Sequence, residues 1–316
     1  MAREFALIAR ILAARSVVPD DVLVDAGDDC AVLAGGALAV GNDLSVEGVH
    51  FRRSWLSEAE IGFRAATAAL SDLAAMAAEP SGVLLALCLG PALGEEEALA
   101  VAGGVIDAAE RVGAGLLGGD LSRGGVLALD VVAIGRCPAP VRRAGARRGD
   151  ELWVTGRLGG AAAAVREWER GAAPSPAARS AFAAPTARVQ EAAWLAARGL
   201  ANALIDLSDG LSSDGGHVAE ASGVALTLDA AAIPVDEEAG ATLESALHGG
   251  EDYELLIAAA PDGMAEAAGE FSQRFGVELT RVGVVRAGAG VYLRGADGRE
   301  LPLRRGGFDH LEGTSA

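Results

Sequence analysis

The chain has 316 residues, of which 51% are hydrophobic and 22% are charged. This length and composition predict two domains of ordinary size with real cores, and they exclude an intrinsically disordered protein. The formal net charge of −18 opposes binding to nucleic acid and to anionic membranes. No lysine occurs, which excludes the phosphate-loop lysine, the protein-kinase strand lysine and a Schiff-base lysine.

The cysteines and the N-terminal segment bear on location. Cys30, Cys88 and Cys137 are odd in number, scattered, and form no C-x-x-C pair, which predicts buried thiols in a reduced cytoplasm. The opening "MAREFALIARILAARS" has the pattern of an amphipathic helix and lacks a continuous secretory core. We expect no membrane span and a cytoplasmic location.

Strands and helices alternate in the first half of the chain. A helix is predicted from about Glu58, and Pro80 is expected to stop it. The other predicted elements are a hairpin of 30–33 with 38–40 that ends at Asp43, a buried strand at 82–90, a helix at 94–113, a short strand at 114–120 that ends at Asp120, and a strand at 126–136.

A seam follows at "RRAGARRGDELWVTG", where basic residues and a Gly-Asp turn lead into a new strand. We place the domain boundary near 139–149, which gives an N-terminal domain of residues 1–140 and a C-terminal domain of residues 141–316. The second half repeats the alternation of helices and strands, and "HGGEDYELLIAAA" predicts a loop that runs into a strand. An α/β fold is expected for both halves.

Many predicted strand ends carry a carboxylate beside a glycine. Glycine lets a backbone approach a ligand closely and adopts positive φ. A single Asp-Gly pair is most often an ordinary turn or a helix N-cap, but five such turns in one chain favour a shared role. The carboxylates concerned are Asp28, Asp29, Asp43, Asp120, Asp206, Asp209, Glu251 and Asp252.

Asp72 lies inside "RAATAALSDLAAMAAEP", a predicted helix that is apolar nearly all round. Such a helix is expected to be buried, and a buried carboxylate needs a compensating partner. Lysine is absent, and Arg64 is two turns away. A metal cation is one candidate partner; a core hydrogen bond or a place on an exposed stripe is the alternative.

Together these carboxylates have the chemistry of a site for hard cations such as Mg²⁺. Mg²⁺ binds a few carboxylates, water and substrate phosphates, so an acidic chain can hold a phosphate through metal bridges. Glycine-rich turns add backbone N–H groups for phosphate oxygens. Ca²⁺ is disfavoured because no D-x-[DN]-x-[DN]-G loop occurs. We expect acidic side chains from both halves of the chain to serve this role.

Several segments, taken together, resemble the thiamine-monophosphate kinase family. They are "GDDCAVL", "VEGVHF", "LSDLAAMAAEP", "GGDLSRG", "RRAGARRGDELWVTG", "IDLSDGLSSDGGH", "GGEDYELL" and "GFDHL", in the family's order over nearly the whole chain. The resemblance implies the two-domain α/β (α+β) fold of the aminoimidazole ribonucleotide synthetase superfamily. It also implies a homodimer, in which the N-terminal domain forms a barrel shared with its copy.

The resemblance further implies roles for individual residues. The magnesium ligands would be Asp29, Asn42, Asp43, Asp72, Asp120, Asp206 and Asp209. ATP would contact Gly119, Asp120, Arg143 and Ser208, and thiamine monophosphate would contact His50, Glu251 and Phe308. Asp214 is expected to lie behind these ligands or in solvent. Judged by residue type alone, His50 would be structural, Arg143 part of a solvated face, and Phe308 ordinary packing.

Two segments depart from the family's pattern. Gly41-Asn42 stands where the family usually has a Ser/Thr pair, so a hydroxyl ligand is lost and the Asn42 amide oxygen is a candidate replacement. Leu121 replaces the usual threonine after the Gly-Gly-Asp turn. These changes affect the details of one magnesium site more than the reaction.

The implied reaction is direct in-line transfer of the ATP γ-phosphoryl group to thiamine monophosphate, the last step of thiamine diphosphate biosynthesis. A phosphate monoester has a second pKa of about 6, so the nucleophile is mostly ionised at neutral pH and no general base is needed. Catalysis then depends on alignment and on neutralising anionic oxygens, without a phosphoenzyme.

Two other functions remain open at this point. The first is another enzyme of the superfamily, but selenophosphate synthetase needs a lysine, and the hydrogenase maturation dehydratase needs a C-terminal cysteine; the last cysteine here is Cys137. The second is a metal-dependent nucleotide sensor that binds ATP without turnover. It predicts ATP binding without ADP release on any thiamine phosphate.

Overall fold

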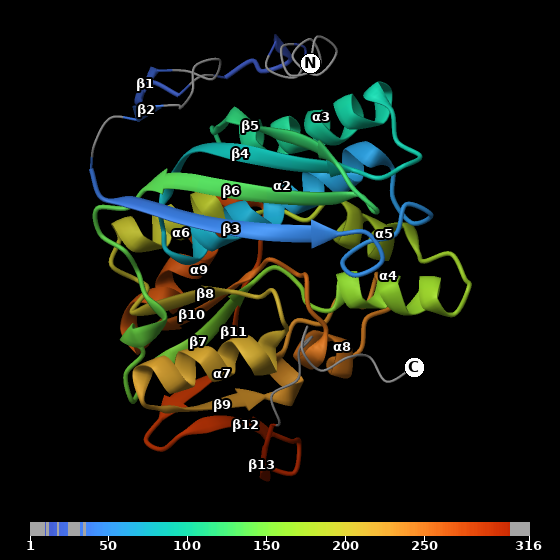
Figure 1. The fold of residues 1–316 in the computed structure, drawn as a ribbon. Coiled ribbons are helices and arrows are strands. Elements are labelled where there is room, and N and C mark those ends of the chain that lie inside the picture. The colour runs from blue at the N-terminus through green and yellow to red at the C-terminus, as the bar shows by residue number, and fades with distance from the viewer. Residues whose placement is uncertain (1–9, 11–12, 18, 25–31, 34–35, 304–316) are drawn as a thin grey trace. The chain divides into compact units, whose positions relative to one another are not determined.

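The fold is described from a computed structural model, which describes residues 10, 13–17, 19–24, 32–33 and 36–303 (Figure 1). Its contacts divide the chain into two compact mixed α/β units. The first contains Met1–Pro140 and Ala183–Ala193, and the second contains Val141–Phe182 and Trp194–Ala316. Residues 183–193 thus group with the first unit, although the sequence places them in the second domain.

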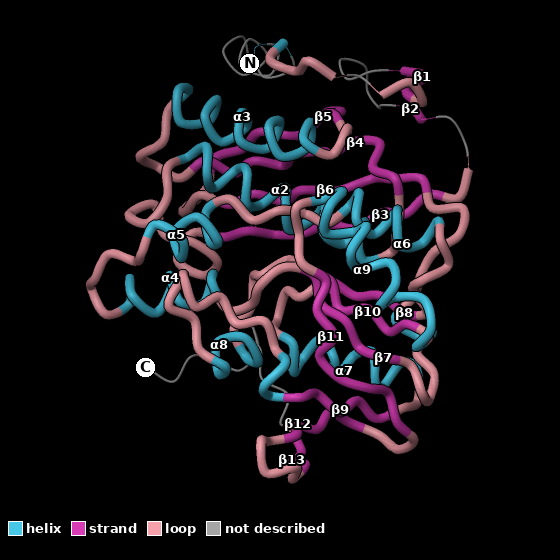
Figure 2. The backbone as a smooth tube through the Cα atoms, turned by 180° about the vertical axis from the view of Figure 1, so that it is seen from behind, coloured by secondary structure: helices cyan, strands magenta, loops and turns pink. Residues whose placement is uncertain are grey.

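A four-stranded sheet and two helices build the first unit. The strands lie in the order β3 (Leu38–Val46), β6 (Ala128–Arg136), β4 (Glu79–Leu89) and β5 (Gly115–Arg123). β6 is antiparallel to β3 and β4, whereas β4 and β5 are parallel. Helices α2 (Glu58–Ala75) and α3 (Glu95–Arg111) cover one face of the sheet (Figures 1 and 2). A separate ladder pairs β1 (Val22–Val24) with β2 (Val32–Leu33).

Local chemistry explains how α2 begins and how it packs. It begins at Glu58, as predicted, after a capping box in which the Ser57 N–H donates to the Glu60 carboxylate at 2.8 Å. Glycines lie where α2 and α3 cross: a Cβ on Gly62 would collide with the α3 backbone, and one on Gly104 with the α2 backbone. The two helices therefore approach more closely than larger residues would allow.

Several sequence predictions for this unit are wrong. In the described part of the chain β2 pairs with β1 and β3 with β6, so 30–33 and 38–40 do not form a hairpin. Pro80 does not stop α2, which ends before it; Pro80 lies in β4. Asp43 and Asp120 lie inside β3 and β5 and not at strand ends, because backbone ladders continue through glycines that interrupt the apolar pattern.

The second unit contains a seven-stranded mixed sheet. Neighbouring strands are antiparallel, apart from the parallel pair β12 and β9. Their order is β13 (Glu300–Pro302), β12 (Gly290–Arg294), β9 (Ala225–Asp229), β11 (Leu279–Arg286), β7 (Glu151–Thr155), β10 (Leu255–Ala259) and β8 (Ala203–Asp206).

Helices lie on both faces of this sheet. α7 (Leu211–Ser222) and α9 (Pro261–Phe275) are on opposite faces (Figures 1 and 2). A buried apolar core joins α7 to the sheet and includes Leu211, Val218, Leu226 and Leu256. The remaining helices are η1 (Arg143–Gly145), α4 (Gly160–Glu169), α5 (Pro176–Ala183), η2 (Ala230–Ala232) and α8 (Leu243–His248), with α6 (Val189–Ala197) at the border of the two units.

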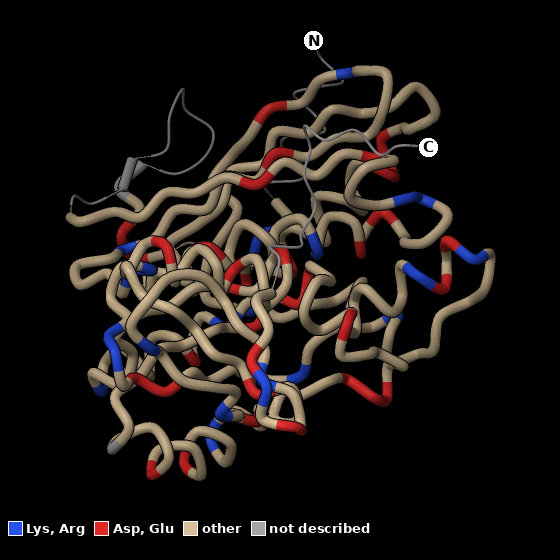
Figure 3. Tube along the Cα trace, turned by 90° about the horizontal axis from the view of Figure 1, so that it is seen from below, with Lys and Arg blue, Asp and Glu red and all other residues tan. Residues whose placement is uncertain are grey.

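Charged positions are spread over the described part of the chain. Acidic and basic positions are interspersed along the chain trace, so the net charge of −18 is not gathered in a single run (Figure 3). Among the described residues, none of the helices combines the length and apolar character that crossing a bilayer requires.

Candidate active site

The loop after β8 carries three of the predicted site residues. β8 ends at Asp206, as predicted, and Asp206 is buried. Ser208 and Asp209 follow, and Gly210 begins α7 with φ of 95°. A Cβ on Gly210 would meet the backbone carbonyl of Gly249 at 2.7 Å, so glycine is needed both for the left-handed backbone and for the close approach of two loops.

A short ladder attaches the segment of Glu251 to this loop. The Glu251 N–H donates to the Ser208 carbonyl at 2.8 Å, and the Tyr253 N–H donates to the Leu207 carbonyl at 2.9 Å. The Leu207 N–H donates to the Glu254 carbonyl at 2.7 Å. The structure therefore brings together the predicted ATP-contact residue Ser208 and the predicted substrate-contact residue Glu251.

Asp214 supports Asp209 from behind. Its carboxylate is buried and accepts the Asp209 N–H at 3.0 Å. Burial, together with the nearby carboxylates of Asp206 and Asp209, raises the pKa of Asp214 to about 8, although the Asp209 N–H and Arg143 act in the opposite direction. The loop therefore brings three acidic side chains close to a predicted phosphate-binding arginine. Of the two places expected for Asp214, the structure supports the one behind the predicted ligands and not the one in solvent.

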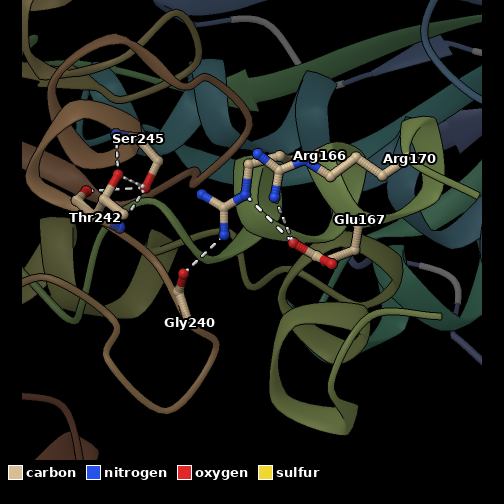
Figure 4. A network of polar contacts seen from close by, with 6 residues as sticks. All are labelled: Arg166, Glu167, Arg170, Gly240, Thr242 and Ser245. Carbon is tan, nitrogen blue, oxygen red and sulfur yellow. Dashed lines mark hydrogen bonds and ion pairs between the residues drawn. The ribbon is translucent and has the colours of Figure 1, made fainter. Parts of the chain in front are cut away.

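Helices α4 and α8 lie beside the loop that follows α8 and carries Gly249 and Glu251. α8 starts with a capping pair, in which the Ser245 N–H donates to Thr242 Oγ1 at 3.2 Å, and it ends at His248, next to Gly249 (Figure 4). Arg166 of α4 donates to the Gly240 carbonyl at 2.9 Å, which ties α4 to the chain just before α8 (Figure 4). At the other end of α8, His248 Nδ1 lies 2.8 Å from Ser212 Oγ of α7.

In the first unit, Asp72 and Asp43 lie on the same face of β3. Asp72 is partly buried on α2, and its Oδ2 would lie 3.2 Å from a Cβ built on Gly41. Asp43 is two residues further along β3, so its side chain points to the same face, ~7 Å from that of Gly41. Gly41, which replaces the family's hydroxyl residue, therefore leaves room for the Asp72 carboxylate over β3.

Asn42 and Asp120 belong to the opposite face of the sheet. The side chain of Asn42 points to the opposite face from that of Asp43, because successive side chains of a strand alternate. Its Nδ2 donates to Asp130 Oδ1 at 3.3 Å. The strand register places Asp120 beside Ala86, and Ala86 beside Asp130. The structure thus does not bring Asn42 or Asp120 next to Asp43. Gly119, one residue before Asp120, packs so tightly on the Leu85 backbone that a Cβ would collide.

His50 is held in the turn that follows β3. Its Nδ1 accepts the Val46 N–H at 3.0 Å, so the proton of the neutral imidazole is on Nε2. Nε2 is then the ring atom that can donate to a phosphate oxygen. Two further predicted residues, Asp29 and Phe308, lie outside the described residues.

The acidic side chains of the described residues fit Mg²⁺ better than a metal ion whose ligands all come from the protein. Within the described ranges, no group of three or more His, Cys, Asp or Glu side chains is arranged to hold one ion. Mg²⁺ usually takes one or two carboxylates and completes its shell with water and substrate phosphates. The described residues are compatible with that requirement: Asp206 and Asp209, at the end of β8 and just after it, both lie close to Asp214, and Asp43 and Asp72 lie on the same face of β3.

Comparison with known proteins defines the class. The family model of the N-terminal domain of AIR synthase related proteins matches residues 27–137, and that of the C-terminal domain matches residues 147–295. The molecule is therefore a two-domain protein of the AIR synthase related class. A thiamine-monophosphate kinase of Salmonella typhimurium is 33% identical over 324 residues, which covers 98% of each chain. The chain belongs to the thiamine-monophosphate kinase family.

Solved structures agree with this assignment. A crystal structure of thiamine-monophosphate kinase from Stenotrophomonas maltophilia K279a superimposes with a TM-score of 0.82 at 36% identity, covering 94% of this chain and 98% of the other. AaThiL complexed with AMPPCP and TMP superimposes with a TM-score of 0.74 at 28% identity, covering 97% and 96%.

Proposed function

We propose that this protein is a thiamine-phosphate kinase, which transfers the γ-phosphoryl group of ATP to thiamine monophosphate and releases thiamine diphosphate and ADP. Membership of the family supports this, as does the related complex with an ATP analogue and TMP. The structural observation that supports the proposal is the ladder between Ser208 and Glu251, because these are the residues that we propose to contact the nucleotide and thiamine monophosphate.

We further propose Mg²⁺ as the cofactor, held by Asp206 and Asp209 in the second unit and by Asp43 and Asp72 in the first. Asp29 is proposed as an additional ligand. Asp120 is left out, because the strand register places it on the opposite face of the sheet from Asp43. Bound Mg²⁺ supplies Lewis-acid neutralisation of phosphate oxygens. The side chain of Asn42 is left out of this proposal, because it lies on the other face of β3 and bonds Asp130.

The chain's own residues bind and orient the two phosphate compounds. Arg143 is exposed on η1 and close enough to Asp214 to lower its pKa, so its guanidinium can hold nucleotide phosphate beside the acidic loop. His50 donates from Nε2 to the phosphate of thiamine monophosphate, and Glu251 and Phe308 hold the organic cation. The acceptor phosphate is already ionised at neutral pH, so no side chain needs to remove a proton.

Dimerisation through the first unit is part of the same proposal. The sheet face opposite α2 and α3 exposes three apolar side chains of β3, Leu38 (43%), Val40 (66%) and Leu44 (53%), with the polar Asn42 between Val40 and Leu44. Exposed apolar side chains of this kind favour a cover, and we propose that a second copy of the sheet forms a closed barrel across a two-fold axis.

The proposal is tested with purified protein, ATP, Mg²⁺ and thiamine monophosphate, with the products identified by chromatography. Thiamine diphosphate and ADP should form in equal amounts, and thiamine itself should not be phosphorylated. ATP binding without ADP release on thiamine monophosphate would instead identify a nucleotide sensor. Turnover that is equal with and without Mg²⁺ would contradict the metal assignment.

A further inference from the structure

The segment that carries Glu251 has an unusual backbone. Glu251 and Tyr253 both have positive φ, at 71° and 52°, and neither is glycine. Residues with a Cβ avoid this region, and they remain there only where the surrounding structure holds them. Asp252 lies between the two, so whatever holds Asp252 also holds both strained neighbours.

Asp252 is attached to the start of α4. Both of its carboxylate oxygens lie 2.9 Å from the backbone nitrogen of Gly159, the N-cap residue of α4. Gly159 has φ of 85° and packs against Ser245 of α8, so it presents its N–H from a fixed position. The bond joins two segments that are 93 residues apart in the sequence.

A second contact reinforces the same attachment. Thr155, at the end of β7, donates from Oγ1 to Glu254 at 2.6 Å and accepts the Leu255 N–H at 2.8 Å. The connection from Thr155 to Gly159 is thereby fixed to Asp252 and Glu254. Those residues are in turn joined by the backbone ladder to Leu207 and Ser208.

We propose that Asp252 is a positioning residue for phosphoryl transfer: by holding the Gly159 N–H it fixes the left-handed backbone at Glu251 and, through the ladder, the loop that carries Ser208 and Asp209. This rests on the proposed function. Asp252 itself does not contact the reacting groups in this assignment. It acts by setting where Glu251 meets the organic cation relative to the loop that meets the phosphates.

The surroundings of Asp252 argue against a role in stability alone. Burial raises its pKa well above the usual range, and the nearby carboxylates of Glu254, Asp236 and Glu251 add to the effect, while the Gly159 N–H opposes it. A carboxyl among three other acids is an unfavourable choice for folding. The Asp252 side chain is, however, long enough for its oxygens to accept the Gly159 N–H.

The test compares Asp252→Ala and Asp252→Asn with the unaltered protein. The readouts are kcat, the KM for thiamine monophosphate, the KM for ATP, and amide hydrogen exchange of residues 206–209 and 249–254. The matched control is Asp150→Asn. Asp150 is also buried and accepts a backbone N–H, that of Arg147 at 2.8 Å, but it lies at the opposite end of β7. If Asp252→Ala does not fold, the Asp252→Ser variant is used instead. The serine side chain is also too short to reach the Gly159 N–H.

We expect Asp252→Ala to lose about 100-fold in kcat/KM for thiamine monophosphate, because small misplacements of aligned groups have effects of that size. Exchange should rise in both loops, Asp252→Asn should recover most of the activity, and Asp150→Asn should change neither loop. Loss of stability with unchanged kcat, KM and loop exchange would overturn the proposal. So would an asparagine variant as impaired as the alanine one. If the unaltered protein does not phosphorylate thiamine monophosphate, the proposed function fails, while the exchange data still decide whether Asp252 holds the loops.

Discussion

Gly250 lies directly against the backbone carbonyl of Ser208, so closely that no side chain fits between them. The contact brings the loop after β8 and the loop before β10 together at one edge of the seven-stranded sheet. The spacing of Ser208 and Glu251, which we propose to contact the nucleotide and the substrate, is therefore set by backbone packing. A side chain added at Gly250 should therefore impair the reaction more than it impairs folding.

Gly250→Ala tests this directly. The added Cβ must push Ser208 and Glu251 apart, so kcat/KM should fall by about 100-fold while the circular dichroism spectrum is unchanged. Gly269→Ala is the control, because Gly269 lies within α9 with open space around it. Equal kinetics for Gly250→Ala and Gly269→Ala would show that the loop spacing does not matter.

Removing one proposed ligand should impair turnover far more than folding. Asp209→Asn and Asp72→Asn keep side-chain volume but lose an anionic oxygen, and loss of one electrostatic contact at a reacting centre costs about 10²–10³-fold in kcat. The expected result is that fall in kcat, with a higher Mg²⁺ concentration for half-maximal activity and little change in melting temperature. Asp229→Asn, at an ion pair with Arg294 at the end of β9 in the same unit as Asp209, serves as the control.

Gly41→Ser tests the departure from the family's pattern in β3. Asp72 Oδ2 would be 3.2 Å from the new Cβ, so the end of that side chain must move by a few tenths of an ångström. The added hydroxyl can then donate to Asp72 or join the ligands, and the Mg²⁺ concentration for half-maximal activity should fall. Gly41→Val, which adds bulk without a donor, should raise it. If serine and valine behave alike in the Mg²⁺ titration, the space above Gly41 has no part in metal binding.

The stability of the second unit should fall as pH rises because of Asp252. Its folded-state pKa is raised by burial first, and by Glu254, Asp236 and Glu251, whereas its unfolded pKa is about 3.9. The folded form therefore retains a proton that the unfolded form has lost. The resulting stabilisation is complete below pH ~4 and declines by up to ~1.4 kcal/mol per pH unit until the folded pKa is reached.

Denaturant unfolding between pH 4 and pH 8 measures this contribution as a difference between two proteins. Asp252→Asn cannot ionise, so its free energy of unfolding should decline less over this range than that of the unaltered protein. Parallel pH curves for the two proteins would mean that Asp252 has the same proton affinity in both states.

Val40→Asp should abolish the proposed dimer. Val40 is 66% exposed on the uncovered sheet face, and a carboxylate there would be repelled by its symmetry mate. Sedimentation should show a dimer for the unaltered protein and a monomer for the variant. Glu278→Gln, at an exposed ion pair with Arg157 in the second unit, is a control that should remain dimeric. A monomeric unaltered protein would refute the shared barrel.

Much of the site could be predicted from the sequence because its parts are local. The end of β8 at Asp206, the start of α2 at Glu58 and the glycine at the start of α7 follow from strand pattern, capping chemistry and the positive φ that Gly210 supplies. The family itself is readable from the order of short motifs. These features depend on residues within a few positions of one another.

Other features depended on contacts between distant segments. The sequence shows a carboxylate at 252 but not that Gly159 would donate to it from 93 residues away, nor that its neighbours would adopt positive φ. It also did not reveal that Asp43 and Asp120 lie inside strands, on opposite faces of one sheet, because strand register is set by the pairing of β3, β6, β4 and β5. The amino-acid order alone determined the family and the kinds of side chain available; the three-dimensional packing decided which of them meet, since side-chain direction and proton affinity depend on neighbours that only folding supplies.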